Sequence, residues 1–479
     1  MESISNVIAP IFWGVLLLSL LVFVHEGGHF LAARACGVRV TEFFLGLPCR
    51  FSVYHASRRI GTRFGVTPLL LGGYAAICGM DPEESPHAAD VLDFVHRHGT
   101  ASVAQISSEL SITEEEALDT CAFLLNWGSL APVYDASKGE GPRSKFYPST
   151  YAAMPRDAAG NTVFDGRAFD RAHATAEGEP WIAPDGAEAF LASERSHTYI
   201  GKGFWKRAFM LVAGIAVNLV SGIMLFVIAY SVIGFQTPLD SNLLGSVATG
   251  SPAAAAGISE GDRILSVEGD AVATWTEITS SLNTAREAGS DPIELTVWTP
   301  DADAPPAPEG VASDDMASYL ADHGSIREVA LSPADDGMIG VGVSYHTVRV
   351  DPVASARLSF DFLVSTAQGV AKLLIPQHTM EVLDNSTSVV GISVMSAEAA
   401  QDGAGTFLSL AALISFSLGF MNLLPIPPLD GGKLLIEVIQ AVTRREVPVK
   451  VQLILSYIGI ALFGFLFLYM LRGDILRLF

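Results

Sequence analysis

Two histidines and a glutamate stand close together in the first apolar stretch of the chain. In His25-Glu26-Gly27-Gly28-His29 the two histidines are four residues apart, so on a helix His25 and His29 share one face and can bind a single zinc ion. Glu26 is near enough to take a proton from water that such an ion activates. These residue types at this spacing predict a zinc hydrolase.

The stretch that carries the motif is long enough to cross a bilayer as a helix. It begins near Ile8 and ends near Ala33, and about 20 apolar residues suffice for a transmembrane span. A buried histidine pair that bonds to neighbouring helices, or a proton relay, would use the same residues. Ionisable groups inside hydrocarbon are costly and commonly functional, which favours metal binding.

The composition is that of a membrane protein with water-soluble parts. Half of the 479 residues are hydrophobic and 17% are charged. The formal net charge of −22 argues against nucleic acid as a partner, because phosphate binding needs clustered Lys and Arg. The four cysteines precede the second apolar stretch, as expected of a reducing, cytoplasmic first loop; they are Cys36, Cys49, Cys78 and Cys121.

A β-region and an acidic insertion follow the first apolar stretch. Short alternating runs within 37–80, separated by Gly or Pro, predict a small sheet beside the membrane. Its edge either accepts an extended peptide or is merely structural. Residues 81–200 are an inserted acidic lobe whose helical runs at 88–98, 102–110 and 113–127, with a hairpin through 138–147, are similar to a winged helix.

The lobe is expected to contact protein and not DNA. Its third helix opens with the capping-box pattern Thr113-Glu114-Glu115-Glu116 and contains no Lys or Arg through residue 126, whereas DNA reading needs basic side chains. Residues 152–196, rich in Gly, Ala and Pro, are predicted to be a linker.

A second soluble region follows the second apolar stretch, which spans 209–233. It contains Ser251-Pro252-Ala253 before a short helix, then Gly261-Asp262-Arg263-Ile264 leading into a strand and a glycine turn. This succession resembles a PDZ domain, which accepts peptide ends. Within the second apolar stretch stands a lone Asn218, for which a helix–helix hydrogen bond is favoured over a functional role.

The last two apolar stretches, 405–424 and 451–471, enclose a proline-rich break. Three prolines stand in four residues, at Pro425, Pro427 and Pro428, and stop a helix at membrane depth. Non-helical backbone is tolerated there only where it is buried or lines a cavity. Asp430 is then either presented from a broken helix or the N-cap of the next helix.

The predicted fold class is a polytopic α-helical membrane protein with about four transmembrane helices, a membrane-associated β-region, a PDZ-like domain and an inserted cytoplasmic lobe. Lys and Arg residues lie next to the apolar stretches, within 34–63, 202–207 and 433–450. Loops rich in Lys and Arg are typically cytoplasmic, which predicts that these loops lie in the cytoplasm and the PDZ-like domain outside it. The predicted segments are transmembrane helix 1 at 1–36, the β-region at 37–80, the lobe at 81–200, transmembrane helix 2 at 201–235, the PDZ-like domain at 236–348, a connecting amphipathic segment at 349–404, and transmembrane helices 3 and 4 at 405–479.

Four features in this order resemble the site-2 protease family, in its bacterial regulator-of-sigma-E branch. They are His25-Glu26-Gly27-Gly28-His29, Leu71-Gly72-Gly73-Tyr74, the PDZ-like domain and Asn422-Leu423-Leu424-Pro425-Ile426-Pro427-Pro428-Leu429-Asp430-Gly431. The chain departs from the family in having one PDZ-like domain where close relatives often have two, a lobe in a loop that is usually short, and Gly214-Ile215 in place of the common Gly-Pro.

The resemblance implies a zinc metalloendopeptidase of a bacterial cytoplasmic (inner) membrane. Its Zn²⁺ ligands would be His25, His29 and Asp430, with Glu26 as the base. Asn422, Gly73 and Tyr74 would bind an extended substrate. Expected partners are the lipid bilayer, a regulator docked on the lobe, and single-span membrane substrates such as anti-sigma factors or remnant signal peptides, cut in regulated intramembrane proteolysis.

Two alternatives remain open. In the first, the protein is a catalytically silent membrane scaffold whose PDZ-like domain binds partners, which predicts a missing ligand or base. In the second, it is a zincin-type membrane protease that acts on misfolded cytoplasmic proteins, which predicts a third ligand in a soluble domain.

Overall fold

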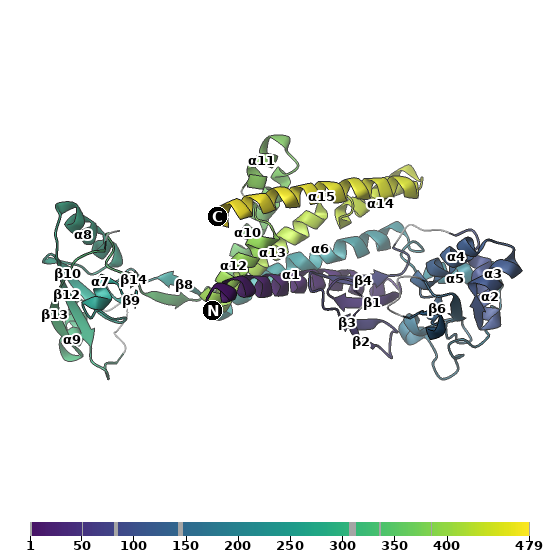
Figure 1. The fold of residues 1–479 in the computed structure, drawn as a ribbon, viewed down its shortest axis with the longest axis horizontal. Helices are drawn as coiled ribbons and strands as arrows, with labels where there is room; N and C mark the ends of the chain where they lie inside the picture. The colour runs from purple at the N-terminus through teal and green to yellow at the C-terminus, as the bar shows by residue number, and fades with distance from the viewer. Residues whose placement is uncertain are drawn as a thin grey trace. The chain divides into compact units, whose positions relative to one another are not determined.

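The computed structural model describes residues 2–49, 51–80, 85–141, 147–305, 313–334, 337–384 and 386–478. The chain divides into two units, Met1–Ala229 with Asp351–Phe479 and Tyr230–Val350. The larger unit holds the apolar helices, a sheet beside them and the inserted lobe (Figure 1).

Among the described residues, four helices are long and apolar enough to cross a membrane, as predicted. They are α1 (Glu2–Ala35), α6 (Phe204–Val227, continued by a π-helix at Ile228–Ile233), α13 (Ala404–Leu423) and α15 (Val449–Leu478). The helices α10 (Pro352–Lys372) and α11 (Pro376–Asp384) meet at 117° and would add a fifth span if they cross as one.

The helices α1, α6 and α13 pack side by side, and α12 (Val389–Asp402) lies against α1 and α13 (Figure 1). The prolines after Leu423 end α13, and α14 (Asp430–Thr443) starts at once and packs along α6. A Cβ atom at Gly432 would overlap the backbone nitrogen of Pro427. Glycine therefore lets α14 start directly against the loop that ends α13.

The predicted β-region is a four-stranded sheet in the order β2-β3-β1-β4. Its strands are β1 (Val40–Leu45), β2 (Val53–Ala56), β3 (Arg63–Val66) and β4 (Gly73–Ile77). The pair β1–β3 is parallel, and the other two pairs are antiparallel. The strand β4 is one edge of the sheet and packs against α1, the helix that carries His25-Glu26-Gly27-Gly28-His29.

The inserted lobe begins with three helices and a small sheet around one core. The helices are α2 (Ala88–His98), α3 (Val103–Leu110) and α4 (Glu114–Asn126), and the strands β5 (Thr100–Ser102), β6 (Leu130–Val133) and β7 (Thr150–Ala153) lie in the order β5-β7-β6. The predicted capping box is present, since the Thr113 and Glu116 side chains each bond to the other's backbone. The antiparallel pair β6–β7 flanks the predicted hairpin, of which residues 142–146 lie outside the described part.

The linker predicted for residues 152–196 is wrong. This stretch contains part of β7, the 3₁₀ segment Val163–Ala168 and α5 (Ala187–Ser196), and its Arg156 and Glu194 are each 1% exposed. Glu194 accepts paired hydrogen bonds from Arg156 at 2.7 and 2.8 Å and from Arg39 at 2.7 and 3.0 Å. Buried ion pairs, which a Gly- and Ala-rich composition does not reveal, hold this stretch in place.

The buried His96 of α2 makes the lobe sensitive to acid. Its Nδ1 donates to Leu92 O at 2.9 Å and its Nε2 accepts from Arg156 Nε at 3.3 Å. A proton added to Nε2 would therefore point at the N–H of Arg156. Burial, and then the charge of Arg156, lower the pKa of His96 to about 3.

Acid is expected to destabilise the lobe through His96. Because the unfolded chain takes up the proton near the ordinary pKa of 6.5 and the folded lobe does not, stability falls as the pH drops below 6.5, by about 2 kcal/mol between pH 7 and pH 5. Hydrogen exchange of α2 and α4, corrected for intrinsic rates, measures this. His96→Gln should flatten the dependence; the exposed His98→Gln on the same helix should not, and equal slopes in both variants would contradict the assignment.

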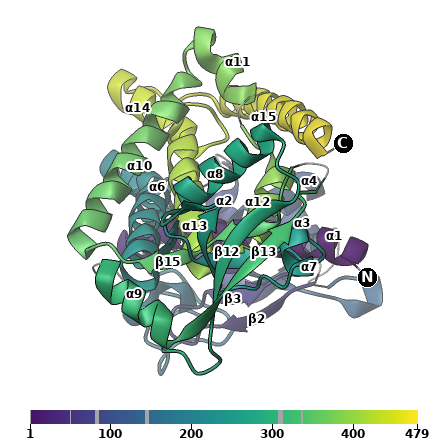
Figure 2. The same ribbon diagram turned by 90° about the vertical axis from the view of Figure 1, so that its left-hand side faces the viewer.

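The smaller unit, Tyr230–Val350, is built mainly of strands (Figure 2). Its largest sheet has the order β11-β10-β12-β13, and two-stranded pairs join β14 to β9 and β15 to β8. The strands are β8 (Phe235–Pro238), β9 (Leu244–Val247), β10 (Arg263–Val267), β11 (Asp270–Ala271), β12 (Ile293–Pro300), β13 (Gly324–Leu331), β14 (Val341–Val343) and β15 (Tyr345–Val348). The helices are α7 (Pro252–Ala255), α8 (Trp275–Ala288) and α9 (Ser313–Asp322).

Candidate metal centre

The apolar helix α1 places His25 and His29 toward the same point inside the larger unit. Their side chains are 8% and 6% exposed, and their Nε2 atoms lie 3.1 Å apart. One turn of helix separates the two residues, so their spacing follows directly from helix geometry.

Asp430 completes this group from the far end of the sequence. It is the first residue of α14, and its Oδ2 lies 3.0 Å from the Nε2 atoms of both His25 and His29. The three ligand atoms lie within 4.8 Å of one another and could hold a metal ion, the one such group found in the described part of the chain. Two imidazole nitrogens and one carboxylate oxygen are the donor set of catalytic zinc sites.

Contacts from α6 orient both imidazoles. His29 Nδ1 donates to Met210 O at 2.8 Å, which leaves the lone pair of Nε2 facing the group, as a metal ligand requires. A Cβ atom at Gly214 would overlap His29 Nε2. Glycine at this position therefore allows α6 to pass close behind the two histidines, and the sequence Gly214-Ile215 keeps that space.

Asn218 makes the helix–helix hydrogen bond favoured from the sequence, and its partner is one of the two histidines. Its side chain is fully buried, and its Nδ2 lies 3.2 Å from His25 Nδ1, while its Oδ1 has no hydrogen-bond partner among the described atoms. Exchanging the two ends of the amide lets His25 Nδ1 donate to Oδ1 and frees Nε2 for a metal. The one signal in the sequence was an amide alone in an apolar span.

Glu26 lies beside the group, at the edge of the sheet. Its Oε2 accepts a hydrogen bond from the backbone N–H of Ala75 in β4 at 3.2 Å. Together with His25, Asn422 and Asp430, it lines a cavity of about 360 Å³. The structure therefore joins the predicted base to a space in which a substrate could lie.

The predicted substrate-binding residues lie on two sides of this region. Asn422 lines the cavity from the last turn of α13. Gly73 and Tyr74 begin β4, the strand that contacts Glu26 through Ala75. The Tyr74 hydroxyl donates to Glu42 at 2.7 Å and its ring stacks on Phe44, so this side chain supports the sheet.

Comparison with known proteins identifies the family. The model of peptidase family M50 matches residues 13–466. Zinc metalloprotease RasP of Geobacillus kaustophilus strain HTA426 is 24% identical over 490 residues, covering 100% of this chain and 99% of the relative. The regulator of sigma-W protease RasP of Bacillus subtilis strain 168 is 25% identical over 466 residues, covering 97% and 98%. Because the family match extends over most of the sequence, this chain belongs to peptidase family M50, the site-2 protease family, and is a zinc metalloendopeptidase.

Proposed function

We propose that this enzyme cleaves transmembrane segments of single-span membrane proteins, such as anti-sigma factors or remnant signal peptides, in regulated intramembrane proteolysis. The observation that carries the proposal is the position of the metal-binding group. His25 and His29 lie on a helix able to span a membrane, and Asp430 lies at a proline-rich break directly after another such helix. This position supports hydrolysis of a peptide within the membrane.

In this proposal His25, His29 and Asp430 hold Zn²⁺, which when bound supplies the Lewis acidity that makes water a nucleophile at neutral pH. Glu26 accepts the proton of the attacking water and passes it to the leaving amine nitrogen. Asn422, which lines the same cavity, offers its amide to the substrate backbone. The polar side chains are thus divided between binding the metal, moving the proton and holding the peptide.

A substrate must reach this cavity in an extended form, because the peptide bonds of a helix are shielded by their own hydrogen bonds. The β4 edge supports such binding: Ala75 N–H, on the side of β4 away from β1, points at Glu26. A substrate strand that pairs with β4 near Gly73 and Tyr74 would take over this N–H. Glu26 would then be released to act as the base.

The remaining parts of the chain are proposed to control access. In the lobe, three helices and a sheet ordered β5-β7-β6 support a winged-helix-like element that docks a protein regulator. In the smaller unit, a short helix after Ser251 and the surrounding strands support a PDZ-like domain. By the distribution of basic residues, the lobe faces the cytoplasm and the PDZ-like domain lies outside a bacterial inner membrane.

Removal of the metal is expected to stop cleavage. We expect a zinc chelator to reduce cleavage of a tagged single-span substrate by the purified enzyme in vesicles at least about 100-fold, and stoichiometric Zn²⁺ to restore it, because water is a weak nucleophile without a Lewis acid. Mg²⁺, which prefers oxygen ligands, serves as the control and should not restore activity. Cleavage that persists at the original rate after metal removal would contradict the proposed mechanism.

A further inference from the structure

The end of the inserted lobe contacts both elements that carry the metal-binding residues. We infer that residues 194–199, here called the closing segment, position the two halves of the metal centre, α1 and α14, relative to each other. The inference rests on the proposed roles of His25, His29 and Asp430 as metal ligands. It assigns positioning roles to Tyr199 and Glu437.

The first contact of the closing segment is with the chain that leaves α1. Arg39 follows the last residue of α1 by four positions, and its guanidinium donates to Glu194 at 2.7 and 3.0 Å. Its backbone N–H donates to His197 O at 2.9 Å. A neighbouring part of the lobe adds a fourth bond, because Arg34 in the last turn of α1 donates to Phe164 O at 2.6 Å. The helix with both histidines is thus anchored to the lobe.

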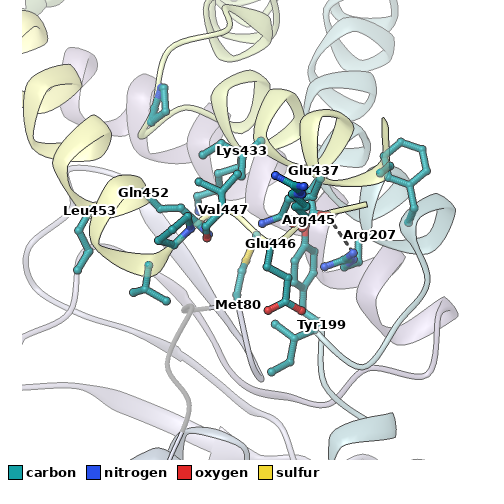
Figure 3. A pocket seen from close by; sticks show the side chains of 18 of the residues that line it. Met80, Tyr199, Arg207, Lys433, Glu437, Arg445, Glu446, Val447, Gln452 and Leu453 are labelled. Carbon is teal, nitrogen blue, oxygen red and sulfur yellow. Dashed lines mark hydrogen bonds and ion pairs between the residues drawn. The ribbon is translucent and has the colours of Figure 1, made fainter. Parts of the chain in front are cut away.

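The second contact is with α14, the helix that begins at Asp430. Tyr199 OH donates to Glu437 Oε1 at 3.1 Å, and Arg207 of α6 forms an ion pair with Glu437 at 3.2 Å. Tyr199 and Glu437 are 6% and 7% exposed, so water competes little for these bonds. Figure 3 shows Glu437 near Arg207 and Tyr199 at a cavity of about 520 Å³.

Glu437 lies on the same face of α14 as Asp430. The two residues are seven positions apart, which is two helical turns or about 10 Å. A contact that fixes Glu437 therefore limits both rotation of α14 about its axis and tilting of its first turn. Either movement would carry the Asp430 carboxylate away from the two histidines.

The closing segment is itself held rigidly between these two contacts. Tyr199 N–H donates to Cys78 O at 2.8 Å, and Cys78 N–H donates to Arg39 O at 3.0 Å, so the segment pairs with the residue that directly follows β4 in the four-stranded sheet. Displacing it would disturb the Arg39 and Glu437 contacts together. The lobe thus has a direct structural route to a metal ligand, by which a protein bound to the lobe would alter the enzyme.

The test is the rate at which the purified full-length protein loses zinc to a chelator. Tyr199→Phe removes one hydroxyl and keeps the ring, and we expect it to speed zinc loss about three- to tenfold, the worth of one buried hydrogen bond. Glu437→Ala should have at least the same effect. Because both act through one contact, Tyr199→Phe should add nothing in the Glu437→Ala background. Gln440→Ala, on the same helix and cavity wall, is the matched control and should match the wild type.

Asp430→Ala distinguishes a failure of the positioning role from a failure of the proposed ligand set. Fast zinc loss in Asp430→Ala together with wild-type loss in Tyr199→Phe would overturn the positioning role and leave the metal centre intact. Wild-type zinc loss in Asp430→Ala would instead overturn the proposed ligand set. Additive effects of Tyr199→Phe and Glu437→Ala, or an equal effect of Gln440→Ala, would show general loosening of α14 and would also overturn the inference.

Discussion

Replacing Glu26 with glutamine is expected to lower cleavage of a single-span membrane substrate by about 10²- to 10⁴-fold, while the zinc content stays that of the wild type. The amide has the size of the carboxylate but cannot accept the proton of the attacking water. The donor atoms of His25, His29 and Asp430 are unchanged, and the amide oxygen can still accept from Ala75 N–H. Cleavage of a tagged substrate in membranes, with metal analysis of both purified proteins, gives the answer.

Glu398→Gln is the matched control for Glu26→Gln. Glu398 is exposed on α12, which packs against α1, so the same chemical change should leave both activity and zinc unaltered. Equal cleavage by Glu26→Gln and the wild type would remove the proposed base. A metal-retaining wild type that cleaves no single-span membrane substrate would contradict the proposed substrate class.

Local spacing made part of the metal centre predictable from the sequence. His25 and His29 are one helical turn apart, and a long apolar run commits this segment to a helix, so the shared face follows from backbone geometry alone. The four apolar helices were predictable for the same reason, because hydrophobic length is a local property. The sheet strands at 40–77 followed from alternation and from the Gly and Pro residues between them.

The third side chain of the group could not be placed in this way. Asp430 lies 405 positions from His25, and spacing alone left it as either the N-cap of a helix or a functional carboxylate. In the structure Leu429 is the N-cap and Asp430 is the first helical residue, with its carboxylate directed at the histidines. From the sequence, Asp430 could be assigned to the same site as the two histidines only through the resemblance to a known family.

The buried charged residues of the inserted lobe could not be predicted from its composition. Arg39, Arg156, Asp165 and Glu194 are charged residues that a sequence pattern assigns to a solvated surface, yet their side chains are at most 2% exposed. Their partners are 38 to 155 positions apart, so no periodicity reveals them. A buried network of this kind is costly to break from one side, and it acts together with the apolar core of the lobe, to which Ala183 and Phe190 of this stretch contribute.

Glu194 is the carboxylate on which this network depends. Burial by itself raises the pKa of Glu194, but the charges of Arg156 and Arg39 and their hydrogen bonds outweigh burial and hold that pKa well below its ordinary value. A carboxylate whose pKa is depressed in the folded state stabilises the fold above its unfolded pKa of 4.5, and this stability is lost as the pH falls further. At neutral pH the full contribution is present.

Removing that carboxylate is expected to destabilise the lobe more than any single exposed change. Glu194→Ala leaves Arg156 facing no carboxylate among its described partners and leaves Arg39 with Asp165 alone, and we expect a loss of about 3–5 kcal/mol, the usual cost of breaking a buried ion pair from one side. Hydrogen exchange of peptides from α2, α4 and α5 in the full-length protein measures the loss. The exposed Glu188→Ala on the same helix α5 should stay within about 0.5 kcal/mol of the wild type. Equal hydrogen exchange in both variants would show that the network does not stabilise the lobe. If only Glu194→Ala exchanges faster and also loses zinc faster, the ion pairs that stabilise the lobe also support the metal centre through Arg39.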